Sequence, residues 1–218
     1  MAHAVTVGHQ EAEEHSTTTG LDNRKMLMWV FLGSDVMFFG AFIATYLVYR
    51  DRSLVGPYPN TILDIPLTTL STFVLLMSSL AMVLALYYVQ HDRPGLGRLW
   101  ILVTAGLGTI FIGFQVYEFN HFVHLGLTPR TNLFGTTFFV LTGFHGAHVT
   151  LGILWLLGMA WASSKGALTS KNALNLEIAG LYWHFVDIVW IVIFTVVYLI
   201  SANDGPPVGL PTVPPIGP

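Results

Sequence analysis

The chain contains no cysteine among its 218 residues. This absence excludes disulfide bonds, iron–sulfur clusters and zinc sites built from thiolates. Haem and copper ligation by histidine stay open, because nine histidines are present.

Charged residues are also scarce. Only 10% of the residues are charged and 53% are hydrophobic, whereas a soluble domain carries about 25% charged residues. The formal net charge of −3 lacks the basic excess that a nucleic-acid-binding surface requires. The composition therefore indicates a membrane protein and gives no sign of nucleic-acid binding.

Five long apolar stretches explain this composition. A helix that crosses the hydrocarbon core needs about 20 mostly apolar residues, and it satisfies its own backbone hydrogen bonds there. None of the stretches alternates with the period of a strand. The short connections RDRSLVGPYPNTILDI and HDRPGLGR contain Pro and Gly, which predict turns or loops. The sequence thus predicts an all-α bundle of five transmembrane helices, at residues 26–49, 66–89, 99–121, 134–162 and 178–201.

The distribution of Lys and Arg predicts the orientation. If the N-terminus is cytoplasmic, six basic residues lie inside, namely Arg24, Lys25, Arg93, Arg98, Lys165 and Lys171. The other three, Arg50, Arg52 and Arg130, then lie outside. The positive-inside rule favours this arrangement, with the C-terminus outside. We expect a polar tail over 1–25, the membrane domain over 26–201 and a Pro/Gly-rich tail over 202–218.

Several ionisable residues interrupt the apolar stretches. Each costs roughly 2–3 kcal/mol if it faces lipid, so we expect hydrogen bonds between helices or positions near the membrane surfaces. Asp35 lies near the middle of its span and is the best candidate for a functional carboxylate. His148 is expected to pair with a carboxylate of a neighbouring span, and His184 with Glu118 or Asp35. The complete set is Asp35, Glu118, His121, His145, His148, Glu177, His184 and Asp187.

Two other functions fit some of these residues. His145, His148 and His184 would serve a membrane dihaem cytochrome, although histidines facing each other at matching depth are not evident. Asp35, Glu118 and Asp187 would serve a proton-coupled transporter. Hydrogen bonding between helices is the preferred interpretation of the histidines.

Five strings, in order along the chain, carry a family resemblance: SDVMFFGAF (34–42), LSTFVLLMSS (70–79), FQVYEF (114–119), TGFHGAHVTLG (142–152) and YWHFVDIVWIVIF (182–194). Together they resemble subunit III of haem–copper terminal oxidases, the cytochrome c oxidase subunit III family. The chain is similar to the short bacterial form with five helices, which lacks the first two of the seven helices in many mitochondrial-type subunits.

The resemblance implies a non-catalytic subunit of a respiratory oxidase that couples oxygen reduction to proton pumping. Such a subunit lies in the bacterial cytoplasmic membrane, here with a periplasmic C-terminus. It carries no haem, copper or catalytic residue of its own, since the redox centres belong to subunits I and II. It packs on subunit I, binds phospholipid, and supports proton uptake and the durability of the enzyme.

The resemblance leaves the electron donor open. Asp35 stands where many cytochrome c oxidases carry Glu, and this Asp resembles the quinol-oxidase branch, as does the His-containing N-terminal tail. TGFHG and YWHFVD look closer to the cytochrome c branch, which is our working expectation. Asp35, Glu118 and His121 are expected to have lipid or proton-related roles. The expected structural polar network comprises His145, His148, Glu177, His184 and Asp187.

Overall fold

The computed structural model describes residues 22–50, 52–54 and 56–204. Most of the predicted tails, over 1–25 and 202–218, lies outside these residues. The long helices are α1 (Asn23–Tyr49), α3 (Ile65–Gln90), α4 (Pro94–His124), α5 (Leu133–Ser164) and α6 (Ala173–Ile193). The shorter elements are α2 (Pro59–Ile62), the 3₁₀ turns η1 (Ser170–Asn172) and η3 (Ser201–Asn203), and the π-helix η2 (Phe194–Ile200), which continues α6.

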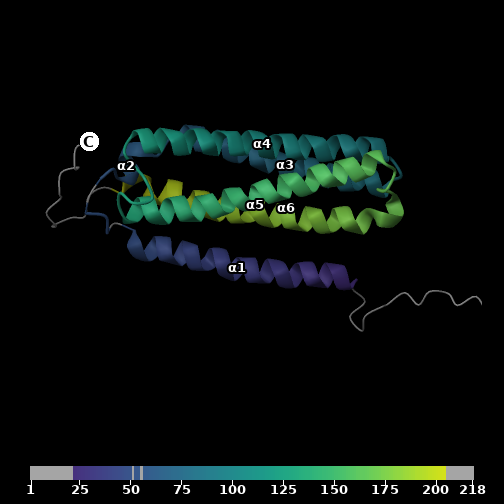
Figure 1. The fold of residues 1–218 in the computed structure, drawn as a ribbon, viewed down its shortest axis with the longest axis horizontal. Helices are drawn as coiled ribbons and strands as arrows, with labels where there is room; N and C mark the ends of the chain where they lie inside the picture. Colours follow the sequence, from purple (N-terminus) through teal and green to yellow (C-terminus); the bar gives the residue numbers. More distant parts are fainter. Residues whose placement is uncertain (1–21, 51, 55, 205–218) are drawn as a thin grey trace, which may run out of the picture.

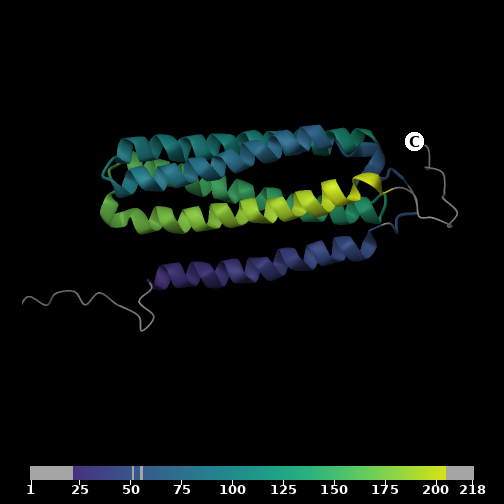
Figure 2. The same ribbon diagram turned by 180° about the vertical axis from the view of Figure 1, so that it is seen from behind.

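The prediction of an all-α protein with five transmembrane helices is confirmed. Five helices are long and apolar enough to cross a membrane, and the described part of the chain contains no strand. Helices α3, α4, α5 and α6 form a bundle, and α1 lies along one side of it (Figures 1 and 2). Helix α1 contacts α5 and α6 and leaves most of its own surface uncovered.

Two helices begin five residues before the predicted transmembrane stretches. Helix α4 begins at Pro94 rather than 99, because proline fits the first helical turn, where its missing N–H is not needed. Part of the loop expected from HDRPGLGR is therefore helical. Helix α6 begins at Ala173 rather than 178, and the short helix α2 lies inside the other expected loop.

Polar side chains define the starts of three long helices. Asp22, Asp64 and Asn132 each accept a hydrogen bond from a backbone N–H of the first helical turn. At Asp22, hydrogen bonds from the side chain and backbone of Arg24 hold the carboxyl pKa below its ordinary value. The caps fix where each of these helices begins.

The centre of the bundle is built around Trp183. A Cβ atom added to Gly108 would lie 2.6 Å from Cη2 of the indole, and one added to Gly152 would lie 2.9 Å from Cζ3. The indole Nε1 donates to the Ser78 hydroxyl at 2.9 Å. Trp183 of α6 is thus held between glycines of α4 and α5 and bonded to α3.

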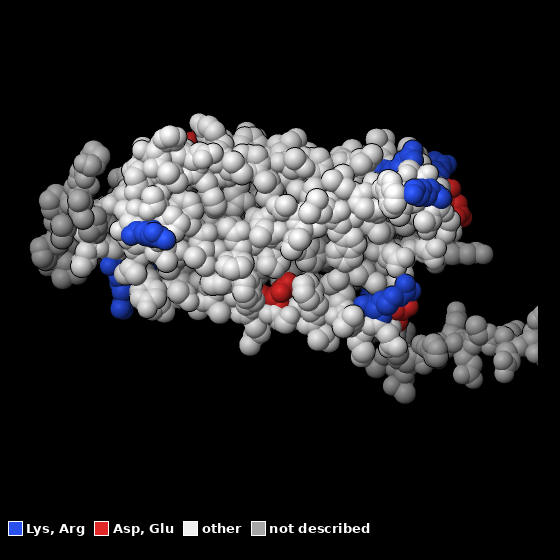
Figure 3. Space-filling model, in the orientation of Figure 1, with Lys and Arg blue, Asp and Glu red and all other residues white. Residues whose placement is uncertain are grey.

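Basic side chains gather at the two ends of the molecule (Figure 3). The start of α1, the α3–α4 connection and the α5–α6 connection lie at the same end. The structure therefore places all six basic residues predicted to be cytoplasmic at one end of the bundle. Which end faces the cytoplasm stays a prediction.

Candidate functional site

Asp35 of α1 and His148 of α5 meet halfway along the bundle. Their atoms Oδ2 and Nε2 are 3.8 Å apart, which is longer than a hydrogen bond. The imidazole Nδ1–H donates to the Phe144 carbonyl at 2.7 Å, and the Tyr182 hydroxyl donates to the His148 carbonyl at 2.9 Å. The carboxylate near His148, expected from a neighbouring span, is therefore Asp35.

Glu118 of α4 lies in a buried cluster where α3, α4 and η2 meet, with only 5% of the residue exposed. Its Oε2 accepts a hydrogen bond from the Tyr198 hydroxyl at 2.8 Å, and its Oε1 lies 2.9 Å from the Thr68 hydroxyl. The π-helix η2 carries Tyr198, and its wider turn positions the ring against α4. Glu118 thereby joins α3, α4 and η2.

His184 and Asp187 lie one turn apart on the part of α6 that faces α3. The His184 Nδ1 is 2.6 Å from the Ser79 hydroxyl, so the pairing expected with Glu118 or Asp35 does not form. Neither carboxylate oxygen of Asp187 has a hydrogen-bond partner among the described residues. Ser79 lies near this carboxylate but outside strict hydrogen-bond geometry, and its hydroxyl is already engaged by His184.

His145 is fully buried in an aromatic cage. Its ring stacks on Trp190 at 4.9 Å between centroids and meets Phe111 edge-on at 5.9 Å. Neither ring nitrogen has a hydrogen-bond partner in the described part of the chain. Nearby, the Gln115 amide donates to the Thr142 carbonyl at 2.7 Å, which joins α4 to α5.

The two remaining candidates lie towards the ends of the bundle. His121 is exposed in the last turn of α4, with its ring parallel to that of Tyr117. Glu177 accepts a hydrogen bond from the Lys25 ammonium at 2.5 Å, which ties the start of α6 to the start of α1.

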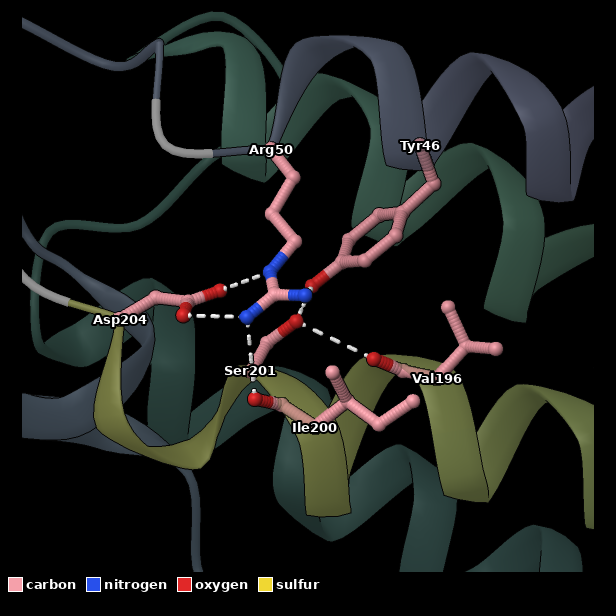
Figure 4. A network of polar contacts seen from close by, with 6 residues as sticks. All are labelled: Tyr46, Arg50, Val196, Ile200, Ser201 and Asp204. Carbon is pink, nitrogen blue, oxygen red and sulfur yellow. Dashed lines mark hydrogen bonds and ion pairs between the residues drawn. The ribbon is translucent and has the colours of Figure 1, made fainter.

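An ion pair that the sequence did not suggest fixes the opposite end of α1 (Figure 4). Arg50 Nε donates to Asp204 Oδ2 at 2.5 Å, and Nη2 donates to Oδ1 at 2.7 Å. The same guanidinium reaches the Ile200 carbonyl at 3.2 Å, and the Tyr46 hydroxyl donates to Ser201 at 3.0 Å. Sequence reasoning placed Arg50 in a loop and Asp204 in a tail, so nothing connected them.

We expect the Arg50–Asp204 pair to stabilise the attachment of α1. The Asp204 side chain is only 10% exposed and that of Arg50 27%. Replacing Asp204 with Asn should lower the free energy of unfolding by about 1.5–3 kcal/mol, the usual range for hydrogen bonds to charged groups. Thermal denaturation of the purified complex, followed through release of this subunit, measures the loss. Arg130→Gln, at an exposed residue of the same end, should change stability by less than about 0.5 kcal/mol, and equal losses in both variants would contradict the prediction.

Two of the imidazoles contact neighbouring helices. His145 lies among aromatic rings of α4 and α6, and Nδ1 of His184 lies 2.6 Å from the Ser79 hydroxyl of α3. Nδ1–H of His148 donates within its own helix to the Phe144 carbonyl. Among the described residues, no group of three or more His, Asp or Glu side chains is placed to hold a metal ion.

The fold and the site together define a multi-pass helical membrane protein whose ionisable groups mostly face neighbouring helices. The family model of cytochrome c oxidase subunit III matches residues 6–202. The chain therefore belongs to the cytochrome c oxidase subunit III family, which confirms the resemblance found in the sequence, and it acts as subunit III of a haem–copper oxidase together with other oxidase subunits.

Curated relatives of two kinds are similar over most of the chain. Cytochrome c oxidase subunit 3 of Bacillus sp. strain PS3 is 39% identical over 190 residues, covering 87% of this chain and 92% of the relative. The probable quinol oxidase subunit 3 of Staphylococcus saprophyticus is 40% identical over 178 residues, covering 81% and 89%. The probable quinol oxidase subunit 3 of Staphylococcus haemolyticus is 38% identical over 195 residues, covering 86% of this chain and 96% of the relative.

Proposed function

We propose that this chain is a non-catalytic subunit that supports proton uptake and durability in a proton-pumping respiratory oxidase. The redox centres, haem and copper, belong to subunits I and II, and this chain packs on subunit I. Its place is the bacterial cytoplasmic membrane, with the N-terminus in the cytoplasm and the C-terminus in the periplasm. The family membership and the gathering of six basic residues at one end support this proposal.

The Asp35–His148 contact is the observation that supports the proposed role in proton uptake. Two titratable side chains lie 3.8 Å apart near the middle of two membrane-spanning helices. Ionisable residues at such depth are costly and mark functional positions in membrane proteins. Glu118 and His121 are proposed as secondary positions, although both oxygens of Glu118 already contact hydroxyl groups.

An apolar hollow between α3 and α4 supports the proposal that the subunit binds phospholipid. The hollow has a volume of about 460 Å³ and is open to the surface, and it is lined by Leu67, Ile110, Gly113, Phe114 and Tyr117. Its walls offer apolar contacts and a glycine surface, which suit an acyl chain lying against the helices.

The choice of electron donor is a finer proposal. The relatives include both cytochrome c and quinol oxidase subunits, and we propose cytochrome c as the donor of this complex. Oxygen consumption by the purified complex with reduced cytochrome c, compared with a quinol, decides between them. Faster turnover with the quinol would overturn the choice of donor.

Replacing Asp35 with Ala tests the proposed role directly. We expect slower proton uptake and faster inactivation during turnover, because the variant removes the carboxylate but leaves the redox centres in other subunits untouched. Proton uptake is followed with a pH-sensitive dye, and inactivation through the decline of oxygen consumption. Ser34→Ala, at the adjacent exposed position, is the control and should behave like the parent. Parent-like values for Asp35→Ala would remove Asp35 from the functional residues.

A further inference from the structure

The carboxyl group of Asp187 is enclosed in the middle of the bundle. Asp187 is residue 15 of the 21 in α6, and only 3% of it is exposed. It lies one turn from Trp183 and one turn from Trp190, both fully buried. Among the described residues, neither carboxyl oxygen has a hydrogen-bond partner and no basic side chain forms an ion pair with it. A negative charge here would lose its hydration without compensation, so the neutral acid form fits these surroundings.

The Ser79 hydroxyl of α3 is the polar group that connects Asp187 to His184. Its Oγ lies 2.6 Å from Nδ1 of His184 and near the Asp187 carboxyl group. Ser71 and Ser78 of the same helix donate to the carbonyls of Thr68 and Leu75. Within the described part of the chain, no carbonyl accepts the Ser79 hydrogen in this way. That hydrogen is therefore available to His184, and the oxygen lone pairs are available to a donor.

The hydrogens of these three side chains allow two arrangements. In the first, the acid form of Asp187 donates to Ser79, and Ser79 donates to Nδ1 of a neutral His184 that carries its hydrogen on Nε2. In the second, a protonated His184 donates to Ser79, and Ser79 donates to the Asp187 carboxylate. Both hold the same number of protons. The first places no charge in the apolar layer and avoids the desolvation cost of a buried ion pair.

The outer end of this chain of hydrogen bonds is Nε2 of His184. The residue is partly exposed, and Nε2 reaches the surface without a hydrogen-bond partner among the residues that the structure describes. Helices α3 and α6 lie side by side on the face of the bundle seen in Figure 2. The three side chains thus lead from an enclosed carboxyl group to the surface between α3 and α6.

We propose that Asp187, Ser79 and His184 form a site that binds one proton and exchanges it with the surface through His184. As the proton leaves, the carboxyl O–H bond breaks and Ser79 Oγ takes that hydrogen. The former Ser79 hydrogen bonds to Nδ1 of His184, and Nε2 releases its hydrogen to water. The net change is one proton lost from the carboxyl group, and uptake reverses these steps. The site is separate from the Asp35–His148 pair and does not depend on the role proposed for that pair.

Infrared spectroscopy of the purified, complete oxidase tests whether Asp187 holds the proton. The carbonyl band of a neutral aspartic acid shifts when the side-chain carboxyl groups of aspartate are labelled with carbon-13. We expect one labelled band of the parent complex to be missing in Asp187→Asn. If that variant does not assemble, Asp187→Glu serves instead, because it moves the band to the unlabelled set. A parent spectrum without any band that depends on position 187 would overturn the proposal, since Asp187 would then be ionised.

The rate at which this band shifts in heavy water tests the path of the proton. Ser79→Ala removes the middle of the chain and His184→Phe its outer end, so each should slow the exchange at least several-fold. Ser71→Ala is the matched control and should exchange at the parent rate, because the Ser71 hydroxyl donates within α3. A purely structural role of Ser79 would change stability without slowing the exchange. Parent-like rates in Ser79→Ala or in His184→Phe would refute the path.

The same measurement on Asp35→Ala separates this site from the proposed function. The Asp187 band should remain in Asp35→Ala and exchange at the parent rate, whatever that variant does to proton uptake. Loss of the band in Asp35→Ala would show that the two sites are one, and would contradict the separate site proposed here. Parent-like proton uptake in Asp35→Ala would count against the proposed function alone.

Discussion

Replacing Gly108 with leucine should cause the largest loss of stability of any single substitution considered for this protein. Even a Cβ atom at position 108 would lie 2.6 Å from the Trp183 ring, which is 1% exposed and cannot move outward. The side chain would displace the indole from its position against Gly152 and break its hydrogen bond to Ser78. Overpacking costs about 1–3 kcal/mol, and a lost buried hydrogen bond adds about 1–3 kcal/mol. We expect a total loss of about 3 kcal/mol or more.

The measurement is the amount of this subunit that remains in the purified oxidase after mild heating, relative to the parent complex. Gly106→Leu is a close control, because Gly106 lies on the same helix two residues away and a Cβ atom there meets nothing within 4 Å. Both variants gain the same side chain and lose the same backbone flexibility, so a difference between them reports the contact with Trp183. If both variants retain the subunit equally, Trp183 does not hold the four helices together in this way.

The five spans could be predicted because their signal is local. A run of about 20 apolar residues specifies a membrane helix without knowledge of its neighbours. Helices α4 and α6 begin before the predicted stretches, because Pro94 and Ala173 lie in more polar sequence that still forms helix. The π-helix η2 could not be predicted, since nothing in its sequence FTVVYLI distinguishes it from an α-helix.

The polar contacts were harder to predict, because they depend on which helices are neighbours. The sequence indicated that His148 needs a carboxylate, and Asp35 lies 3.8 Å away. It did not indicate Ser79 for His184, since serines are too common to single out. The Arg50–Asp204 pair was missed because the two residues are 154 positions apart and were assigned to a loop and a tail.

The attachment of α1 follows from these contacts. In lipid the hydrophobic effect does not drive helices together, so packing and polar contacts decide their association. Helix α1 is joined to α6 through Lys25 and Glu177 at one end and to the segment after η2 through Arg50 and Asp204 at the other. Asp35 contacts α5 in between. Polar contacts at three depths therefore hold a helix that buries little of its own surface.

Replacing Glu118 with leucine should lower the free energy of unfolding by about 2–4 kcal/mol. The change leaves the buried hydroxyl groups of Thr68 and Tyr198 without their acceptor. The Tyr198 side chain is fully buried, so its hydroxyl cannot turn to solvent. The Thr68 hydroxyl loses less, because its Oγ1 also lies 2.9 Å from the Asp64 carbonyl oxygen, to which it can donate its single hydrogen. Most of the loss should therefore come from Tyr198. Thermal denaturation of the purified complex gives the change.

A double-mutant cycle separates this hydrogen bond from the packing of the Glu118 side chain. Tyr198→Phe removes the hydroxyl and keeps the ring, which still contacts Phe138 and Phe194. Combined with Glu118→Leu, it should restore part of the lost stability, because replacing both partners by apolar groups leaves no buried donor unsatisfied. We expect a coupling energy of about 1–3 kcal/mol between the two sites. Simple additivity of the two losses would mean that Glu118 stabilises the bundle by filling space rather than through its hydrogen bond with Tyr198.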